Sequence, residues 1–191
     1  MPKTETFNKE TVIKQATEVF HNKSYSLTSM QDLVDATGLN RSSIYNSFGS
    51  KLDLYMECLK SYRSNFKCKV EELTTTAKTP IKAIESIFLL NIKTNVTNNL
   101  GCLINNCTSE MANQEAAIKN FLNNNHENMI QLFKDLIEKG QFEGSINTNK
   151  SSNQYALYLL NSLQGLSISG IIMNDYKHLE SIVKTTLSIL N

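Results

Sequence analysis

The chain has 191 residues, a length typical of one domain or of one small module joined to a larger one. Hydrophobic residues make up 40% of it, so the composition excludes a largely disordered chain. The formal net charge of +1 excludes a polycation whose overall field attracts nucleic acid. Four cysteines without a signal peptide, and apolar runs interrupted by polar residues, predict a cytoplasmic protein with reduced thiols that does not bind a membrane.

Apolar residues recur at helical spacing along the chain, which predicts an all-α fold of about nine helices. The first helix follows a cap at Asn8, and the second begins at a capping-box pair, Thr28 and Gln31. A turn at Gly38, where a positive φ suits a helix C-terminus, precedes a third helix that is capped by Asn40. The chain therefore opens with three short helices.

A long linking helix is predicted next, from about residue 51 to residue 75. Helical spacing then predicts five further helices, over about 81–92, 102–111, 118–140, 155–173 and 179–190. We expect a three-helix domain over 1–50 and a helical bundle over 51–191.

The third predicted helix is small and polar on its outer side. Leu39, Ile44 and Phe48 are spaced to face the core, while the remaining positions are mostly serine, asparagine and tyrosine. From Ala36 to Leu52 there are two basic residues and no acids, which suits an approach to DNA phosphates. Two short helices joined by a glycine-containing turn predict a helix-turn-helix. The alternative is an ordinary solvated helix that its serines merely cap.

The stretches "AxxxF" (Ala16, Phe20), "TSMQDLVDATGLNRSSIYNSFGSK" and "LDLYMECL" resemble the N-terminal DNA-binding domain of TetR-family transcriptional regulators. One departure is Ser24, because the family usually has glycine in the turn after the first helix. The resemblance implies phosphate contacts from Thr28, Tyr45 and Lys51. The full set of expected DNA-contacting residues is Thr28, Asn40, Arg41, Ser42, Ser43, Tyr45, Asn46, Ser47 and Lys51.

Two of these side chains can read bases. Asn46 has the amide geometry that pairs with adenine, and Arg41 can bind either guanine or a phosphate. The resemblance also implies a regulator that acts mainly as a repressor on double-stranded operator DNA.

The helix predicted over 155–173 is apolar on nearly every side, which indicates burial. Together with the apolar stripe of the last helix, it offers more apolar surface than one small bundle covers. We therefore expect an isologous four-helix interface with a second copy, so that the homodimer reads a pseudo-palindromic operator. The expected interface residues are Tyr155, Leu159, Gly165, Leu166, Gly170, Leu179, Ile182, Val183, Thr186, Leu187 and Leu190. The alternative is a monomer whose last helix covers the preceding one.

A bundle of this kind can also hold a small effector. Candidate lining residues are mainly apolar with a few hydrogen-bonding groups, as in small-molecule pockets. They are Phe88, Ile92, Cys107, Met111, Phe121, Asn125, Met129, Phe133, Tyr158, Asn161 and Ser162. Because none of them is charged, we expect a mostly apolar effector whose binding releases the operator; any single one of them can equally be a core residue.

The sequence also allows two other functions to be considered, a thiol-based sensor and an enzyme. Cys102 and Cys107 flank the polar stretch "LINN", and a thiolate near a helix start is more reactive than a buried thiol, so the regulator could instead sense oxidants or electrophiles. An enzyme is not expected, because the three histidines are scattered and neither paired carboxylates nor a metal-spaced cluster occurs. For the same reason we expect no metal and no cofactor.

Overall fold

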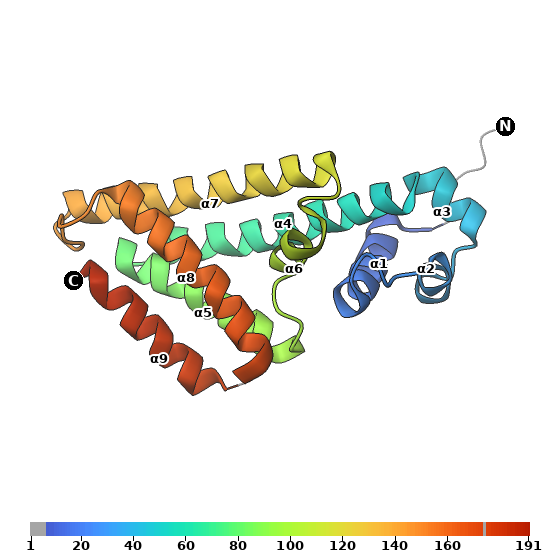
Figure 1. Cartoon of the computed structure of the whole chain (residues 1–191). Helices are drawn as coiled ribbons and strands as arrows, with labels where there is room; N and C mark the ends of the chain where they lie inside the picture. Colours follow the sequence, from blue (N-terminus) through green and yellow to red (C-terminus); the bar gives the residue numbers. More distant parts are fainter. Residues whose placement is uncertain (1–6, 174) are drawn as a thin grey trace. The chain divides into compact units, whose positions relative to one another are not determined.

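The computed structural model describes residues 7–173 and 175–191, without the side chains of 95–98. These residues form nine α-helices and one short 3-10 turn, with no strand among them (Figure 1). The all-α prediction is confirmed. The chain divides into two compact units, Met1–Phe66 and Lys67–Asn191.

The N-terminal unit contains four helices: α1 (Lys9–Lys23), α2 (Met30–Thr37), α3 (Arg41–Phe48) and the first part of α4 (Lys51–Thr76). Its core is formed by side chains with at most 3% exposure, and these include Val12, Ala16, Phe20, Leu33, Ile44, Leu54, Tyr55, Cys58 and Leu59. The ring centroid of Phe20 lies 4.7 Å from that of Tyr55, so α1 and α4 share an aromatic contact.

The division between the units falls within α4, whereas the sequence placed it at the start of this helix. The reason is that the first half of α4 contributes four of the core side chains of the N-terminal unit, from Leu54 to Leu59. These residues pack against α1, and the Cys58 thiol contacts the Ile13 carbonyl oxygen at 3.6 Å.

The capping box of α2 lies one residue later than predicted. Ser29 is the N-cap: its Oγ accepts from the Asp32 N–H (3.1 Å), and Asp32 Oδ2 accepts from the Ser29 N–H (2.9 Å). The pair Thr28–Gln31 does not cap the helix, because the Thr28 hydroxyl donates to the Ser24 carbonyl oxygen instead. Leu33, one turn into the helix, is fully buried.

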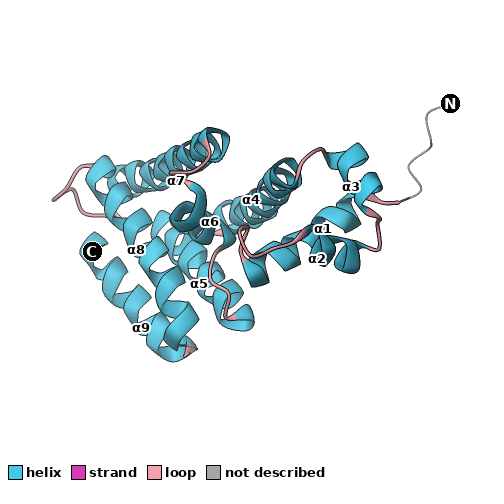
Figure 2. Cartoon of the chain, turned by 45° about the vertical axis from the view of Figure 1, so that its right-hand side comes forward, coloured by secondary structure: helices cyan, strands magenta, loops and turns pink. Residues whose placement is uncertain are grey.

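The C-terminal unit is a helical bundle. Its helices are α5 (Pro80–Asn98), α6 (Leu103–Met111), α7 (Ala116–Phe142), α8 (Ser152–Met173) and α9 (Tyr176–Leu187), followed by the 3-10 turn Ser188–Leu190. α5 packs against α7, α8 and α9, and α6 packs against α7 (Figure 2). The rings of Phe88 on α5 and Phe133 on α7 lie 6.1 Å apart in the core.

Asn147, in the loop between α7 and α8, fastens the C-terminal end of the bundle. Its Nδ2 donates to the carbonyl oxygens of Ile189 (2.9 Å) and Asn191 (2.8 Å). The Tyr155 hydroxyl donates to Asn147 Oδ1. This one side chain therefore connects the loop, α8 and the last turn.

α8 does reach the length and mean apolarity of a membrane span, against the expectation that no apolar run does so. A core helix passes the same test by composition. In the structure α8 packs against α5, α7 and α9, and 39% of its most apolar window is buried. The exposed part of α8 is therefore itself rich in apolar side chains.

Candidate nucleic-acid interface

The turn between α2 and α3 is built on Gly38. Its φ of 69° and ψ of 3° lie in the left-handed region, and its N–H donates to the Val34 carbonyl oxygen at 2.9 Å. Glycine adopts this conformation without the steric cost that a Cβ brings. The predicted turn residue is confirmed, and it lets α3 start in a new direction after only three residues.

α3 is fixed to the unit by a cap and by its inner face. Asn40 Oδ1 accepts from the Ser43 N–H at 2.9 Å, so the carbonyl of this side chain fixes the start of the helix. Ile44 is fully buried, and the rings of Phe48 and Phe7 lie 6.3 Å apart. The helix is anchored along one side only.

The opposite side of α3 gathers most of the predicted DNA-contacting residues on one surface. Arg41, Ser42, Tyr45 and Asn46 are exposed, while Ser43 and Ser47 are half-buried at its edge. Tyr45 keeps 49% of its surface exposed although it is large and aromatic. The face has no acidic residue, so it presents hydrogen-bonding groups and one cation to solvent.

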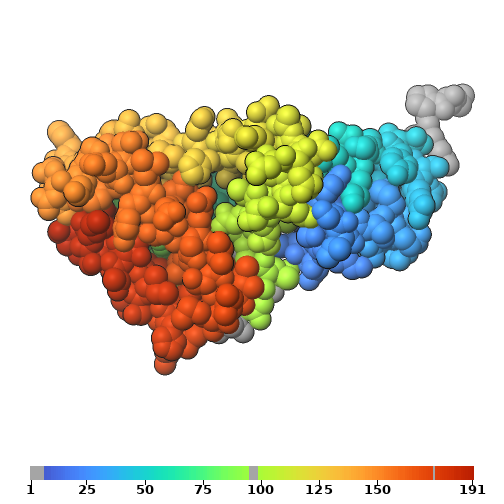
Figure 3. Space-filling model, viewed as in Figure 1, coloured from blue at the N-terminus to red at the C-terminus, as the bar shows by residue number. Residues whose placement is uncertain are grey.

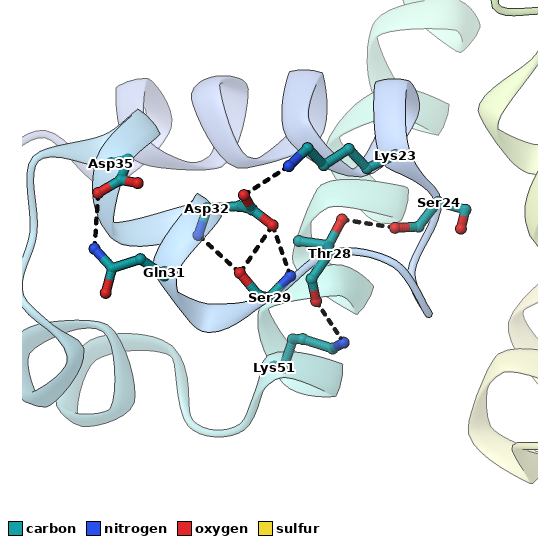
Figure 4. Close-up of polar contacts among 8 residues, drawn as sticks. All are labelled: Lys23, Ser24, Thr28, Ser29, Gln31, Asp32, Asp35 and Lys51. Atoms are coloured by element: carbon teal, nitrogen blue, oxygen red, sulfur yellow. Dashed lines mark hydrogen bonds and ion pairs between the residues drawn. The ribbon is translucent and has the colours of Figure 1, made fainter.

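Gln31 on α2 extends this surface, a role that no local sequence pattern predicts. Its Oε1 lies 3.5 Å from an Arg41 guanidinium nitrogen, and its Nε2 donates to Asp35 Oδ1 at 2.8 Å, a contact drawn in Figure 4. Arg41 is therefore bordered by the polar surface of α2. The two residues are ten positions apart, so only the packing of α2 against α3 brings them together.

Thr28 does not lie as expected for a phosphate contact. It is buried, and its hydroxyl donates to the Ser24 carbonyl oxygen at 2.6 Å (Figure 4). This hydrogen bond stabilises the loop between α1 and α2, so the hydroxyl is not directed to the surface. The prediction of a Thr28 hydroxyl directed at DNA is wrong for this structure, because the hydroxyl closes a local turn.

Lys51 is half-buried at the start of α4. Its ammonium group donates to the carbonyl oxygens of Tyr25 (2.9 Å) and Thr28 (2.8 Å) and lies 4.3 Å from the centroid of the Tyr25 ring. An ammonium group has three N–H donors, so one is left for a further acceptor such as a phosphate. No local sequence pattern predicts that Lys51 contacts Tyr25.

The acids beside this surface are engaged by their own neighbours. An ion pair with Lys23 at 2.6 Å, together with hydrogen bonds from Ser29, lowers the pKa of Asp32 to about 2. Hydrogen bonds from Ser50 lower the pKa of Asp53 from its ordinary value. Both carboxylates are thus held at the ends of helices and directed toward local donors.

Ser24 ends α1 with a φ of 69° and a ψ of 168°. This is a conformation that residues with a Cβ rarely adopt, and it lies where the resemblance expects glycine. The serine is accommodated, but at a cost in backbone strain that glycine does not have.

The expected effector-binding residues separate into three groups in the C-terminal unit. Six of them have at most 9% exposure: Phe88, Ile92, Cys107, Met111, Phe121 and Phe133. Asn125, Met129 and Ser162 are half-buried. Tyr158 and Asn161 lie on the outer side of α8, so the expectation that they line an internal pocket is wrong.

A polar pair that the sequence did not single out lies inside the same bundle. Asn91 on α5 donates through Nδ2 to Ser167 Oγ on α8 at 2.9 Å, and both side chains are at least 93% buried. The Ser167 hydroxyl lies 3.0 Å from the Leu163 carbonyl oxygen. A single small polar residue in an apolar stretch does not predict a buried hydrogen bond. The packing of α5 against α8 is needed to bring the two together.

Most of the expected dimer-contacting residues are core residues of the protomer. The buried ones are Tyr155, Leu159, Leu166, Gly170, Leu179, Val183, Thr186, Leu187 and Leu190. The expectation that they contact a second copy is wrong, because they pack against α5 and α7 or between α8 and α9. Gly165 and Ile182 are exposed.

A different set of apolar side chains faces solvent on α8, on α9 and on the 3-10 turn that follows α9. We call it the α8–α9 face; its members, each at least 39% exposed, are Leu157, Tyr158, Ile168, Ile172, Ile182 and Ile189. α8 and α9 lie together on the side of the C-terminal unit that Figure 3 displays. The members on α8 are exposed, whereas Tyr155, Leu159 and Leu166 on the same helix are buried.

Two short helices are joined by a turn at a glycine, the second helix is anchored on one side and has no acidic residue, and a helical bundle follows. This arrangement defines a helix-turn-helix DNA-binding regulator. Residues 12–58 match the family of bacterial regulatory proteins described as the tetR family. The helix-turn-helix region of the chain therefore matches the corresponding region of TetR-family transcriptional regulators.

The similarity extends over the whole chain. The chain is 28% identical to the HTH-type transcriptional repressor ComR of Escherichia coli K12, over 96% of this chain and 89% of that protein. It is 25% identical to YezE, an uncharacterized HTH-type regulator of Bacillus subtilis 168, over 100% of both chains. A cysteine-substituted variant of the TetR-family regulator CifR, solved with a 26-base-pair operator duplex, has the same fold, with a TM-score of 0.88 and 19% identity over 99% of this chain and 100% of that one.

Proposed function

We propose that the protein is a repressor that binds a pseudo-palindromic operator as a homodimer, with α3 of each copy in the major groove. The observation that carries this proposal is the two-sided character of α3, whose inner face is fixed by Ile44 while its outer face presents polar side chains and no acid. Small outward side chains allow the close approach that the groove requires.

The outward residues have different roles. Asn46 is exposed in the second half of α3, and its amide suits the N6 and N7 atoms of adenine. Arg41, at the first turn, binds a guanine or a phosphate, and Gln31 limits the directions that its guanidinium adopts. Tyr45 and the serines at positions 42, 43 and 47 donate to phosphates. Asn40 contributes by fixing the helix start, since its carbonyl is used in the cap.

The dimer uses the α8–α9 face. Ile168 is 56% exposed and Ile172 is 83% exposed, which is unfavourable for a side chain of this size in water. Gly165, between them and Tyr158, has nothing within 4 Å of the place where a Cβ would be. A glycine at that point gives a second helix room to approach closely, as an isologous helix–helix interface requires.

The effector enters the bundle through a change in packing. Phe88, Phe133 and Ile92 have at most 1% exposure, so their side chains fill the space between α5 and α7. A mostly apolar ligand that separates these side chains selects a different arrangement of helices and so shifts the population of DNA-binding dimers. Thermal-shift screening with apolar aromatic compounds tests this step, and a protein that none of them stabilises counts against it.

A second candidate trigger is oxidation or alkylation of a thiol. Cys102 precedes the first residue of α6 and is half-buried, whereas Cys107 is fully buried. Cys58 is a poor candidate, because burial raises the pKa of its thiol to about 12. If the trigger is Cys102, hypochlorite or an electrophile releases the operator from the wild type and not from Cys102→Ser.

Selection of bound duplexes from a random library tests the main proposal. We expect a two-fold symmetric consensus whose half-sites are about 34–36 Å apart, or a multiple of that spacing. An asymmetric consensus contradicts the homodimer, and the absence of enrichment at modest ionic strength contradicts DNA binding by this surface.

A further inference from the structure

Lys51 makes its hydrogen bonds to the backbone of a loop, and the loop immediately precedes α2. The two carbonyl oxygens that it binds belong to Tyr25 and Thr28, and α2 starts at Met30. Figure 4 shows its side chain extending from α4 to Thr28. One ammonium group therefore connects the start of α4 with the entry to the helix-turn-helix.

The position of Lys51 is electrostatically unfavourable for α4 itself. A cation in the first turn of a helix opposes the macrodipole. The capping role at this end is filled by Ser50 and Asp53, whose carboxylate accepts from the Ser50 N–H at 2.8 Å. Because α4 gains nothing from a lysine here, the compensating interactions are those with the loop and with the Tyr25 ring.

The loop has reason to need an external support. It begins at Ser24, whose backbone is strained by its positive φ. Within it, the Thr28 hydroxyl donates to the Ser24 carbonyl oxygen at 2.6 Å and the Thr28 N–H to the Tyr25 carbonyl oxygen at 3.3 Å. The ring of Tyr25, 5.0 Å from that of Tyr55, supplies an apolar anchor beneath the ammonium group.

We propose that Lys51 is a positioning residue, which holds the loop over residues 24–29 so that α2 and α3 keep the geometry that docks on DNA. A phosphate can take only the third N–H. The DNA part of this inference rests on the proposed function, whereas the support of the loop is a property of the free protein.

Amide hydrogen exchange of the full-length protein without DNA tests the positioning role. We expect Lys51→Met to accelerate exchange over residues 24–30 by about tenfold or more, since hydrogen bonds to a charged group are lost. The matched control is Arg41→Met, which removes a cation from the same unit without a loop contact and should leave exchange over 24–30 unchanged. Unchanged exchange in Lys51→Met overturns the proposal.

Binding to a library-selected duplex and to a mixed-sequence duplex, each over a range of salt concentrations, is the second readout. A plain phosphate contact lowers the salt slope by about 0.9 and weakens both duplexes equally. A positioning residue weakens the selected duplex more than the mixed one. Equal weakening of both duplexes by Lys51→Met overturns the proposal.

If Lys51→Met does not fold, Lys51→Arg replaces it; the guanidinium keeps the charge over Tyr25 but has a different donor geometry, so exchange over 24–30 should rise, and unchanged exchange overturns the proposal. If the wild type binds no duplex, the proposed function fails, while the exchange experiment still decides whether Lys51 supports the loop.

Discussion

Asn91 on α5 and Ser167 on α8 bond to each other inside an otherwise apolar core, with 2.9 Å between Nδ2 and Oγ. Ser167→Ala leaves an Asn91 donor without this partner, and we expect the free energy of unfolding to fall by about 1–3 kcal/mol. Urea denaturation measures it. The control is Ser181→Ala on the exposed side of α9, which should change stability by less than about 0.5 kcal/mol. Equal effects of the two substitutions contradict the assigned role.

Ser24→Gly should stabilise the protein by about 1 kcal/mol. The backbone at this position has a φ of 69°, which costs a residue with a Cβ about 1–3 kcal/mol, and the added freedom of glycine in the unfolded chain offsets part of the gain. Thermal unfolding measures the change. Ser24→Ala is the control, because alanine keeps the Cβ and should bring no stabilisation. A glycine variant no more stable than the alanine variant shows that the strain is absent.

Asn46→Ala should weaken binding to the selected operator by about 1–3 kcal/mol and relax the preference for one base in each half-site. Binding to a mixed-sequence duplex should change little, because a base contact does not contribute to non-specific affinity. Fluorescence anisotropy with both duplexes measures the two effects. The residue is exposed and supports no core contact, so the folded state should persist. Unaltered affinity for the operator rules out a base contact at this position.

Ile168→Asp should convert the dimer into monomers, because it places a charge in the middle of the α8–α9 face, where Ile168 is 56% exposed. Sedimentation velocity measures the change, and operator affinity should fall with it. Phe142→Asp is the matched control, since Phe142 is 93% exposed at the end of α7 and outside this face. A variant at residue 168 that stays dimeric shows that the copies meet elsewhere.

Asp32 should contribute to stability at neutral pH and lose that contribution in acid. Its folded-state pKa of about 2 is lower than the ordinary value of 3.8, so the contribution is complete above 3.8 and decreases as the pH falls toward 2. The difference in urea midpoint between wild type and Asp32→Asn should shrink over that interval. Lys23→Met should raise the pKa of Asp32, as measured by NMR titration, because the first cause of its depression is the bond from Lys23. An unchanged pKa would contradict this cause.

Much of the N-terminal unit could be predicted because its signals are local. Gly38 and Asn40 are identified by their residue types and spacing, and both occupy the predicted turn and cap. Thr28 and Ser29 show the limit of such signals. Both residues have the side chain of a helix cap, but the Thr28 hydroxyl closes a turn to Ser24 and only Ser29 accepts from the start of α2.

The C-terminal unit was harder to predict because α8 is apolar on both sides. Hydrophobic periodicity distinguishes an inner from an outer face only when the outer face is polar. Tyr155 and Tyr158 are one helical turn apart and equally amphipathic, yet one is 1% and the other 41% exposed. Contacts such as Lys51 with Tyr25 were beyond prediction for another reason, since they join distant parts of the chain.

α8 has Ser167 directed into the bundle and Ile168, the next residue, directed to solvent. Because the helix is rigid, its inner face cannot move without moving its outer face. A ligand that separates α8 from α5 must therefore also disturb a second copy bound at Ile168. Dimerisation must in turn weaken the binding of that ligand. By thermodynamic reciprocity the two affinities change by the same factor, so dilution alone should make the protein easier for its inducer to occupy.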